Sequence, residues 1–102
     1  GVLKSQVHII NGKLNGESKY WREDSTIISI ANYSNDRLHG KWSEYYQNGK
    51  LKQIVNYNYG IKHGYEKTYY NNGNLKSEVF YNNGYKTNDT IRYHINGDVI
   101  YK

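Results

Sequence analysis

The 102-residue sequence contains no cysteine, no proline and no methionine. Without cysteine the chain can hold no disulfide framework, no thiolate metal site and no cysteine nucleophile, which fits a reducing compartment. No apolar run approaches the length of about 18 residues that a membrane-spanning helix requires, and no segment has the pattern of a signal peptide. We therefore expect a cytoplasmic protein that does not span a membrane.

Aliphatic residues are also scarce. Hydrophobic residues make up only 36% of the chain, and 13 of them are tyrosines. An ordinary two-layer globular domain needs more aliphatic filling than this to build its core. An array of repeats needs less, because each unit buries its apolar face only against its neighbours.

Recognisable catalytic and cofactor motifs are missing as well. The sequence has no G-x-S-x-G element and no phosphate-binding or dinucleotide-binding glycine fingerprint. Glu44, Glu66 and Asp89 do not form a fixed carboxylate pair. Strand spacing would hold His39 and His63 roughly 10 Å apart, too far to share a metal ion whose ligand bonds are about 2 Å long. We expect no enzyme activity, no metal and no cofactor.

The formal net charge is +5. Basic and acidic residues are interleaved along the chain rather than gathered in runs, which is typical of a solvated surface. The excess of positive charge would nevertheless attract an acidic protein or a polyanion and repel a basic partner.

A repeat of 24 residues organises the chain. When Gly40–His63 is moved forward by 24 positions, it aligns on Gly64–Thr87 without a gap. A fixed period in this range indicates an array of supersecondary units. We expect one repeat domain over residues 1–102, with full repeats at 16–39, 40–63 and 64–87 and partial repeats at 1–15 and 88–102.

Each repeat is predicted to be a β-hairpin. Leu51, Gln53, Val55 and Tyr57 follow one another at a period of two, which is typical of a strand. An Asn-Gly pair, such as the one at positions 48 and 49, is the strongest short hairpin signal when it lies between two such runs. In the central repeat the strands should cover about residues 40–46 and 50–58.

The length of the Asn-Gly loop decides which tyrosine shares a face with Leu51. A two-residue loop would place Tyr46 there, and a three-residue loop with a left-handed Gly49 would place Tyr45 there. The positions equivalent to Tyr45 are all aromatic, namely Trp21, Tyr45, Tyr69 and Tyr93. We therefore prefer the three-residue loop, with the Tyr45 column as the packed face and the Tyr46 column on the other side.

The pattern G-x-x-x-x-Y-Y-x-N-G-x-L-x(5)-Y-x-x-G resembles the bacterial MORN-repeat variant family, which is found in antitoxin-like and toxin-immunity proteins. The resemblance covers residues 16–102, and residues 1–15 by spacing. It implies an all-β fold, a single-layer, twisted antiparallel meander of tandem 24-residue hairpins. It also implies a binding role rather than catalysis.

The function expected from this resemblance is a bacterial immunity or antitoxin protein in the cytoplasm. It would neutralise a cognate toxin protein by occluding it with one face of the sheet, and no small-molecule substrate is expected. Exposed aromatic side chains would anchor the partner, and charges at the rim would set specificity. The candidate contact residues are Trp42, Tyr46, Tyr70 and His94, with Lys52 and Lys76 at the edge.

Other interpretations of the same residues remain open. The Tyr45 column can be simply the core of a thin sheet, and the equivalent lysines Lys52 and Lys76 can be a solvated face that guards against edge pairing. The chain can instead be a peripheral scaffold that binds anionic membrane or nucleic acid through its basic and tyrosine-rich face. It can also be a structural spacer within a longer repeat protein.

Overall fold

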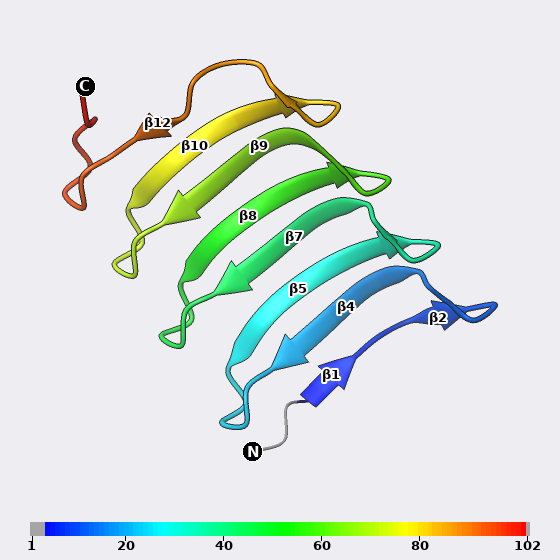
Figure 1. Ribbon diagram of the computed structural model, residues 1–102. Coiled ribbons are helices and arrows are strands. Elements are labelled where there is room, and N and C mark those ends of the chain that lie inside the picture. The colour runs from blue at the N-terminus through cyan, green and yellow to red at the C-terminus, as the bar shows by residue number, and fades with distance from the viewer. Residues whose placement is uncertain (1–3, 102) are drawn as a thin grey trace.

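The computed structural model describes residues 4–101, so three residues of the first partial repeat and the last residue of the final one lie outside the described part. The chain forms a meander of antiparallel strands in one open sheet (Figure 1), as predicted. Its extents of 49 × 35 × 15 Å leave room for a single layer only. The long strands are β4 (Gly16–Trp21), β5 (Ile27–Ser34), β7 (Gly40–Tyr45), β8 (Leu51–Asn58), β9 (Ile61–Tyr69) and β10 (Leu75–Asn82).

Short strands flank this central set. The first, β1 (Lys4–Gln6), pairs with β4, while β2 (Ile9–Ile10) and β3 (Lys13–Leu14) form a separate hairpin. Strand β6 (Arg37–Leu38) pairs with β5 just before β7 begins, so β6 and β7 correspond to the two parts of the longer β9. At the other edge, β11 (Tyr85–Lys86) and β12 (Ile91–Arg92) both pair with β10.

The Asn-Gly end of each hairpin has a three-residue loop. In the central repeat the Tyr46 amide donates to the Lys50 carbonyl at 2.8 Å, and the Gly49 amide donates to the Tyr46 carbonyl at 2.9 Å. Gly49 has a left-handed φ of +87°, and Tyr45 lies directly opposite Leu51. The preferred loop and its pairing are therefore confirmed.

A β-bulge changes the face assignment next to this loop. Glu44 pairs with Gln53 and Tyr45 pairs with Leu51, so Lys52 is an extra residue on its strand. Paired residues share a face, and Leu51 therefore lies on the face of Tyr45, opposite to that of Gln53 and Val55. The expectation that Leu51 and Val55 share one face was wrong, because alternation does not continue through a bulge.

The best-buried apolar side chains lie on the face that we call the valine face. It carries Ala31, Val55 and Val79, which are only 1%, 3% and 5% exposed. The opposite face, called here the aromatic face, carries the column of Trp21, Tyr45 and Tyr69, and these rings are only half-buried. The tightest packing is therefore on the side away from the aromatic column, contrary to the sequence-based expectation.

Glycines of the repeat lie opposite tyrosines on the valine face. Gly40 pairs with Tyr57, and Gly64 pairs with Tyr81. Gly40 and Gly64 have φ values of +100° and +105°, a region that only glycine adopts without strain. The recurring glycine thus supplies a left-handed backbone position opposite a tyrosine, which explains its place in the repeat.

Candidate interaction surface

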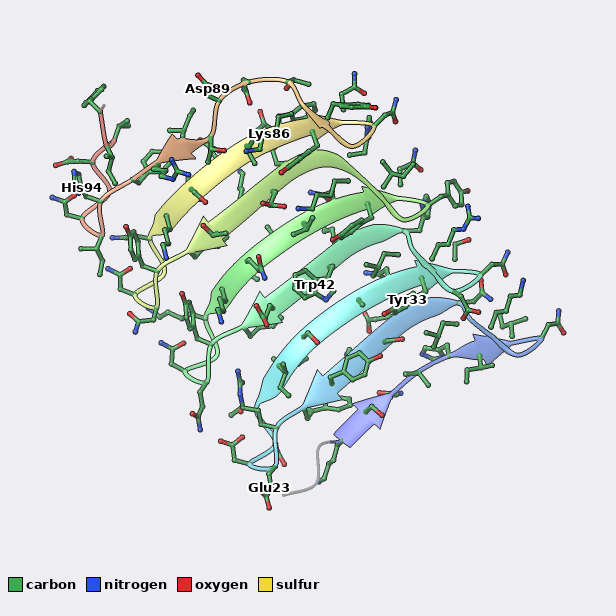
Figure 2. All side chains as sticks on the ribbon, in the orientation of Figure 1. Glu23, Tyr33, Trp42, Lys86, Asp89 and His94 are labelled. Carbon is green, nitrogen blue, oxygen red and sulfur yellow. The ribbon has the colours of Figure 1, made fainter. Side chains whose placement is uncertain are left out.

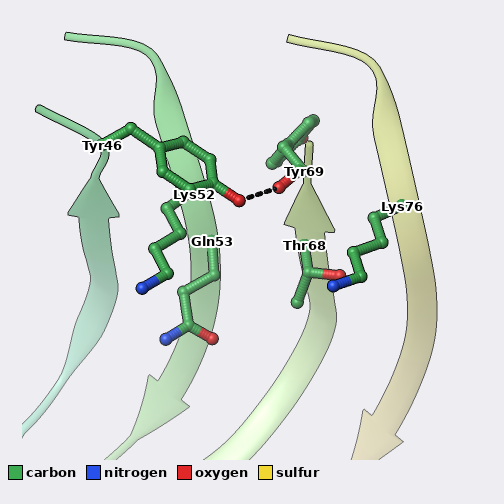
Figure 3. A pocket seen from close by; sticks show the side chains of 6 residues that line it. All are labelled: Tyr46, Lys52, Gln53, Thr68, Tyr69 and Lys76. Carbon is green, nitrogen blue, oxygen red and sulfur yellow. Dashed lines mark hydrogen bonds between the residues drawn. The ribbon is translucent and has the colours of Figure 1, made fainter. Parts of the chain in front are cut away.

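A small groove crosses the valine face between consecutive repeats (Figure 3). It has a volume of about 160 Å³ and lies over strands β8, β9 and β10. Its lining combines aromatic, amide, hydroxyl and ammonium groups, from Tyr46, Lys52, Gln53, Thr68, Tyr69 and Lys76. The groove can therefore offer both hydrogen bonds and positive charge to a bound group.

Tyr46 forms one side of the groove and links two repeats. Its hydroxyl donates to the Tyr69 carbonyl at 2.7 Å (Figure 3). Tyr70 makes the equivalent bond to the Tyr93 carbonyl, also at 2.7 Å. The sequence analysis expected exposed aromatic side chains at these positions, whereas Tyr46 and Tyr70 are half-buried and their hydroxyls are engaged.

A lysine ammonium group lies over each of these two rings. The Lys52 ammonium lies 5.7 Å from the centroid of the Tyr46 ring, and that of Lys76 lies 5.6 Å from the centroid of Tyr70. Such cation–π contacts contribute about 0.5–1 kcal/mol at exposed sites. Lys52 is also 4.0 Å from Glu44, whereas within residues 4–101 Lys76 forms no ion pair.

The predicted contact residues only partly come together. Tyr46, Lys52 and Lys76 line the groove, and Tyr70 lies beneath Lys76. Trp42 is on the same face but lies further along β7, opposite Val55, and is half-buried (Figure 2). His94 is exposed at the last Asn-Gly turn and does not line the groove (Figure 2).

Sequence reasoning did not single out Gln53 and Thr68, which form the floor between the two lysines. The Gln53 amide donates to Glu44 at 3.0 Å, and the Thr68 hydroxyl shares a hydrogen bond with the hydroxyl of Ser77. A period of two places Gln53 on the face of Val55, so its side was predictable. The proximity of Gln53 to Thr68 was not predictable, because Thr68 lies on β9, a strand of the next repeat.

A further lysine on the valine face, Lys62, forms an ion pair with a carboxylate. The Lys62 ammonium binds the Glu66 carboxylate and lies 5.0 Å from the centroid of the Tyr81 ring. The hydrogen bond with Glu66 is the main cause that raises the pKa of Lys62 above its ordinary value. Lys62 therefore stays charged throughout the neutral range.

The repeat histidines support turns. The Nδ1 atom of His39 accepts a hydrogen bond from the Tyr59 amide at 3.2 Å, and its ring stacks on Tyr59 with centroids 4.1 Å apart. His63 accepts the equivalent bond from the Asn83 amide, also at 3.2 Å. Among the residues described, no group of three or more acidic or histidine side chains is placed to hold a metal ion.

Comparison with known protein families finds a match in the central part of the chain. The family model described as MORN repeat variant matches residues 38–59 and 62–83, two adjacent segments whose first residues are 24 positions apart. MORN repeats generally mediate binding to proteins or membranes. No curated protein and no solved structure matches the chain.

In the part of the chain that the structure describes, no helix is long and apolar enough to cross a membrane.

Proposed function

We propose that this chain is a protein-binding module of the immunity or antitoxin type, which neutralises a cognate toxin by covering its active site. The observation that carries the proposal is the groove on the valine face, where half-buried tyrosines are bordered by lysines. Tyrosine is among the residue types that dominate binding energy at protein interfaces. The similarity of the two central repeats to MORN repeats supports a binding role.

The size of the sheet is sufficient for occlusion. A stable protein complex buries about 800 Å² on each partner. One face of a sheet that measures 49 × 35 Å exceeds this area. The whole valine face could therefore cover a catalytic cleft without any second layer or additional domain.

The tyrosines are also held in place before a partner arrives. The hydroxyls of Tyr46 and Tyr70 are fixed to backbone carbonyls of the following repeat. A side chain that is already ordered loses little rotamer entropy on binding. This surface can consequently act by steric cover, with the rings as anchors and the lysines as determinants of specificity.

Co-expression with the protein encoded by the neighbouring gene tests the proposal. We expect that protein alone to stop bacterial growth and the repeat chain to restore growth. The double variant Lys52→Glu/Lys76→Glu should no longer protect, because it reverses the charge at both sides of the groove. The control Lys41→Glu/Lys67→Glu makes the same charge change on the aromatic face. The proposal fails if the chain gives no protection, or if both double variants protect equally.

A second candidate function is peripheral binding to anionic membrane or nucleic acid. The lysines above the Tyr46 and Tyr70 rings favour it, because ammonium groups bind the phosphates of lipid headgroups and of nucleic acids. Affinity would then fall linearly with salt on a log-log plot. Tight binding that is unchanged between low and moderate salt would exclude this candidate.

A further inference from the structure

Positive charge on the valine face gathers in its C-terminal half. Strands β8 to β12 place five cationic side chains there, whereas the carboxylates near them on this face are Glu44 and Glu66. Glu66 is bound by Lys62, and Glu44 accepts a hydrogen bond from Gln53. The cations are Lys52, Lys62, Lys76, Lys86 and Arg92. A partner whose charge complements this surface would therefore be acidic.

The two groove lysines also have a defined spacing. Lys52 and Lys76 are one repeat apart, on β8 and β10, with β9 between them. Neighbouring strands lie about 4.8 Å apart, so the two positions are separated by about 10 Å across the sheet. A chain in the polyproline II conformation advances about 3.1 Å per residue and brings every third side chain back to the same side, so three residues span about the same distance.

From this match we propose that the valine face binds an acidic segment of a partner protein in the extended polyproline II conformation. The segment lies across β8, β9 and β10, and its carboxylates recur at every third residue to meet Lys52 and Lys76. The inference rests on the proposed function, since it names the chemistry of the partner at the same groove. It adds the direction of the bound segment and the spacing of its charges.

The groove floor suits the backbone of such a segment. The Gln53 amide and the Thr68 hydroxyl lie between the two lysines, and an extended chain presents unpaired N–H and C=O groups to them. The groove has a volume of about 160 Å³, which leaves room for one side chain of the segment between the two carboxylates.

The structure favours this occupant over a nucleic acid. Base stacking requires a free aromatic face, and the faces of the Tyr46 and Tyr70 rings on this side are each approached by a lysine. Several of the exposed large apolar side chains, the kind that would insert into a membrane, also lie elsewhere. They include Tyr59, Ile61 and Tyr85, at 54%, 51% and 79% exposure, beside the turns at the other end of the hairpins.

Fluorescence anisotropy with two synthetic peptides tests the inference. Both peptides contain Asp, Ser and Thr in the same proportions, but one has Asp at every third position and the other has its Asp residues in adjacent pairs. We expect the full chain to bind the evenly spaced peptide more tightly. The variant Lys52→Gln/Lys76→Gln should lose about tenfold in affinity, because it removes two solvent-exposed ion pairs with the peptide.

The matched control is Lys41→Gln/Lys67→Gln, which removes two charges from the aromatic face. Lys67 also lies over a tyrosine ring, 5.1 Å from the centroid of Tyr65, so the control repeats that contact as well. Its affinity for the evenly spaced peptide should stay near that of the original chain. Equal losses of affinity in both double variants would show that binding depends only on net charge, and would overturn the inference.

Two further probes separate the other occupants. They are vesicles of phosphatidylcholine with roughly one third phosphatidylserine, and single-stranded oligothymidylate. The inference is overturned if either probe binds through Lys52 and Lys76 while neither peptide does, or if both peptides bind equally well. If the peptides fail but the chain still protects against the toxin, the proposed function stands and only the acidic segment is rejected.

Discussion

At the scale of single residues, one set of side chains joins neighbouring repeats by a hydrogen bond to a residue 23 positions ahead. Tyr46 and Tyr70 donate to the carbonyls of Tyr69 and Tyr93, and Arg22 donates to the Tyr45 carbonyl at 2.9 Å. Arg22 stands where later repeats have tyrosine, so two chemically different donors serve one purpose. This position therefore supplies a hydrogen-bond donor of sufficient length, whether or not it carries an aromatic ring.

Removing one such hydroxyl should weaken the link between two repeats. We expect Tyr70→Phe to lower the free energy of unfolding by about 1 kcal/mol, the usual net contribution of a hydrogen bond. Chemical denaturation monitored by circular dichroism measures this change. The control is Tyr85→Phe, because that side chain is 79% exposed. An equal loss in both variants would show that the inter-repeat bond contributes nothing.

Asp24 is the other residue whose role is local and measurable. Hydrogen bonds from the Thr26 side chain, the Thr26 amide and Gln47 lower the pKa of Asp24 from 3.8 to about 2. Because the pKa is lower in the folded state, the stabilisation is complete above pH 3.8 and is lost as the pH falls towards 2. Asp24 occupies the position in its repeat that Asn48 has in the next. The side-chain Oδ1 atom of Asn48 accepts the equivalent hydrogen bond from the Lys50 amide.

The pKa of Asp24 can be followed by NMR titration of its carboxyl carbon. Thr26→Val keeps the shape of the side chain but removes the hydroxyl, which is the largest cause of the shift. We expect the pKa of Asp24 to rise towards 3.8 in this variant. Thr68→Val, on another strand, should leave the Asp24 titration unchanged. An unaltered pKa in Thr26→Val would contradict the assignment.

At the scale of elements, the hairpins use a different turn at each end. The Asn-Gly end has a three-residue loop with one left-handed residue, such as Gly49. The other end has two consecutive left-handed residues, such as Tyr59 and Gly60, with φ values of +47° and +86°. This second pattern is that of a type I′ turn, whose twist matches that of the strands.

The repeat at 16–39 forms both turns with residues that are less suited than glycine to left-handed backbone angles. Ser25 has a φ of +73° where the next repeat has Gly49. An L-residue in this region costs about 1–2 kcal/mol, and glycine avoids that cost but loses about 0.5–1 kcal/mol through chain entropy. We expect Ser25→Gly to raise stability by about 0.5–1 kcal/mol, as measured by denaturation. The reverse change, Gly49→Ser, should lower it, and stabilisation by Gly49→Ser would refute the argument.

At the scale of the whole molecule, stability comes from contacts between neighbouring strands rather than from a central core. The buried apolar side chains within residues 4–101 are Ala31, Val55 and Val79, one in each full repeat. Each repeat contacts only its neighbours, so stability is approximately a sum of repeat and interface terms. The ends of such an array are its least stable parts, since they have one neighbour instead of two.

Hydrogen exchange should reveal this gradient. Amides in β8 and β9, which pair on both sides, should exchange most slowly, and those in β1, β11 and β12 should exchange fastest. Local opening needs less free energy where fewer contacts are broken. Exchange followed by NMR or mass spectrometry gives the profile along the chain. Uniform protection from β1 to β12 would show instead that the sheet unfolds as one unit.

The sequence alone determined the architecture of this protein. Alternation, the Asn-Gly pairs and the 24-residue period are local signals, so they predicted hairpins, their turns and the pairing of Tyr45 with Leu51. The tertiary structure decided the rest, namely the bulge at Lys52, the burial of Val55 and the groove between repeats. These features depend on side chains about one repeat apart in the chain, such as Tyr46 and Tyr69, and no local pattern specifies how such distant groups meet.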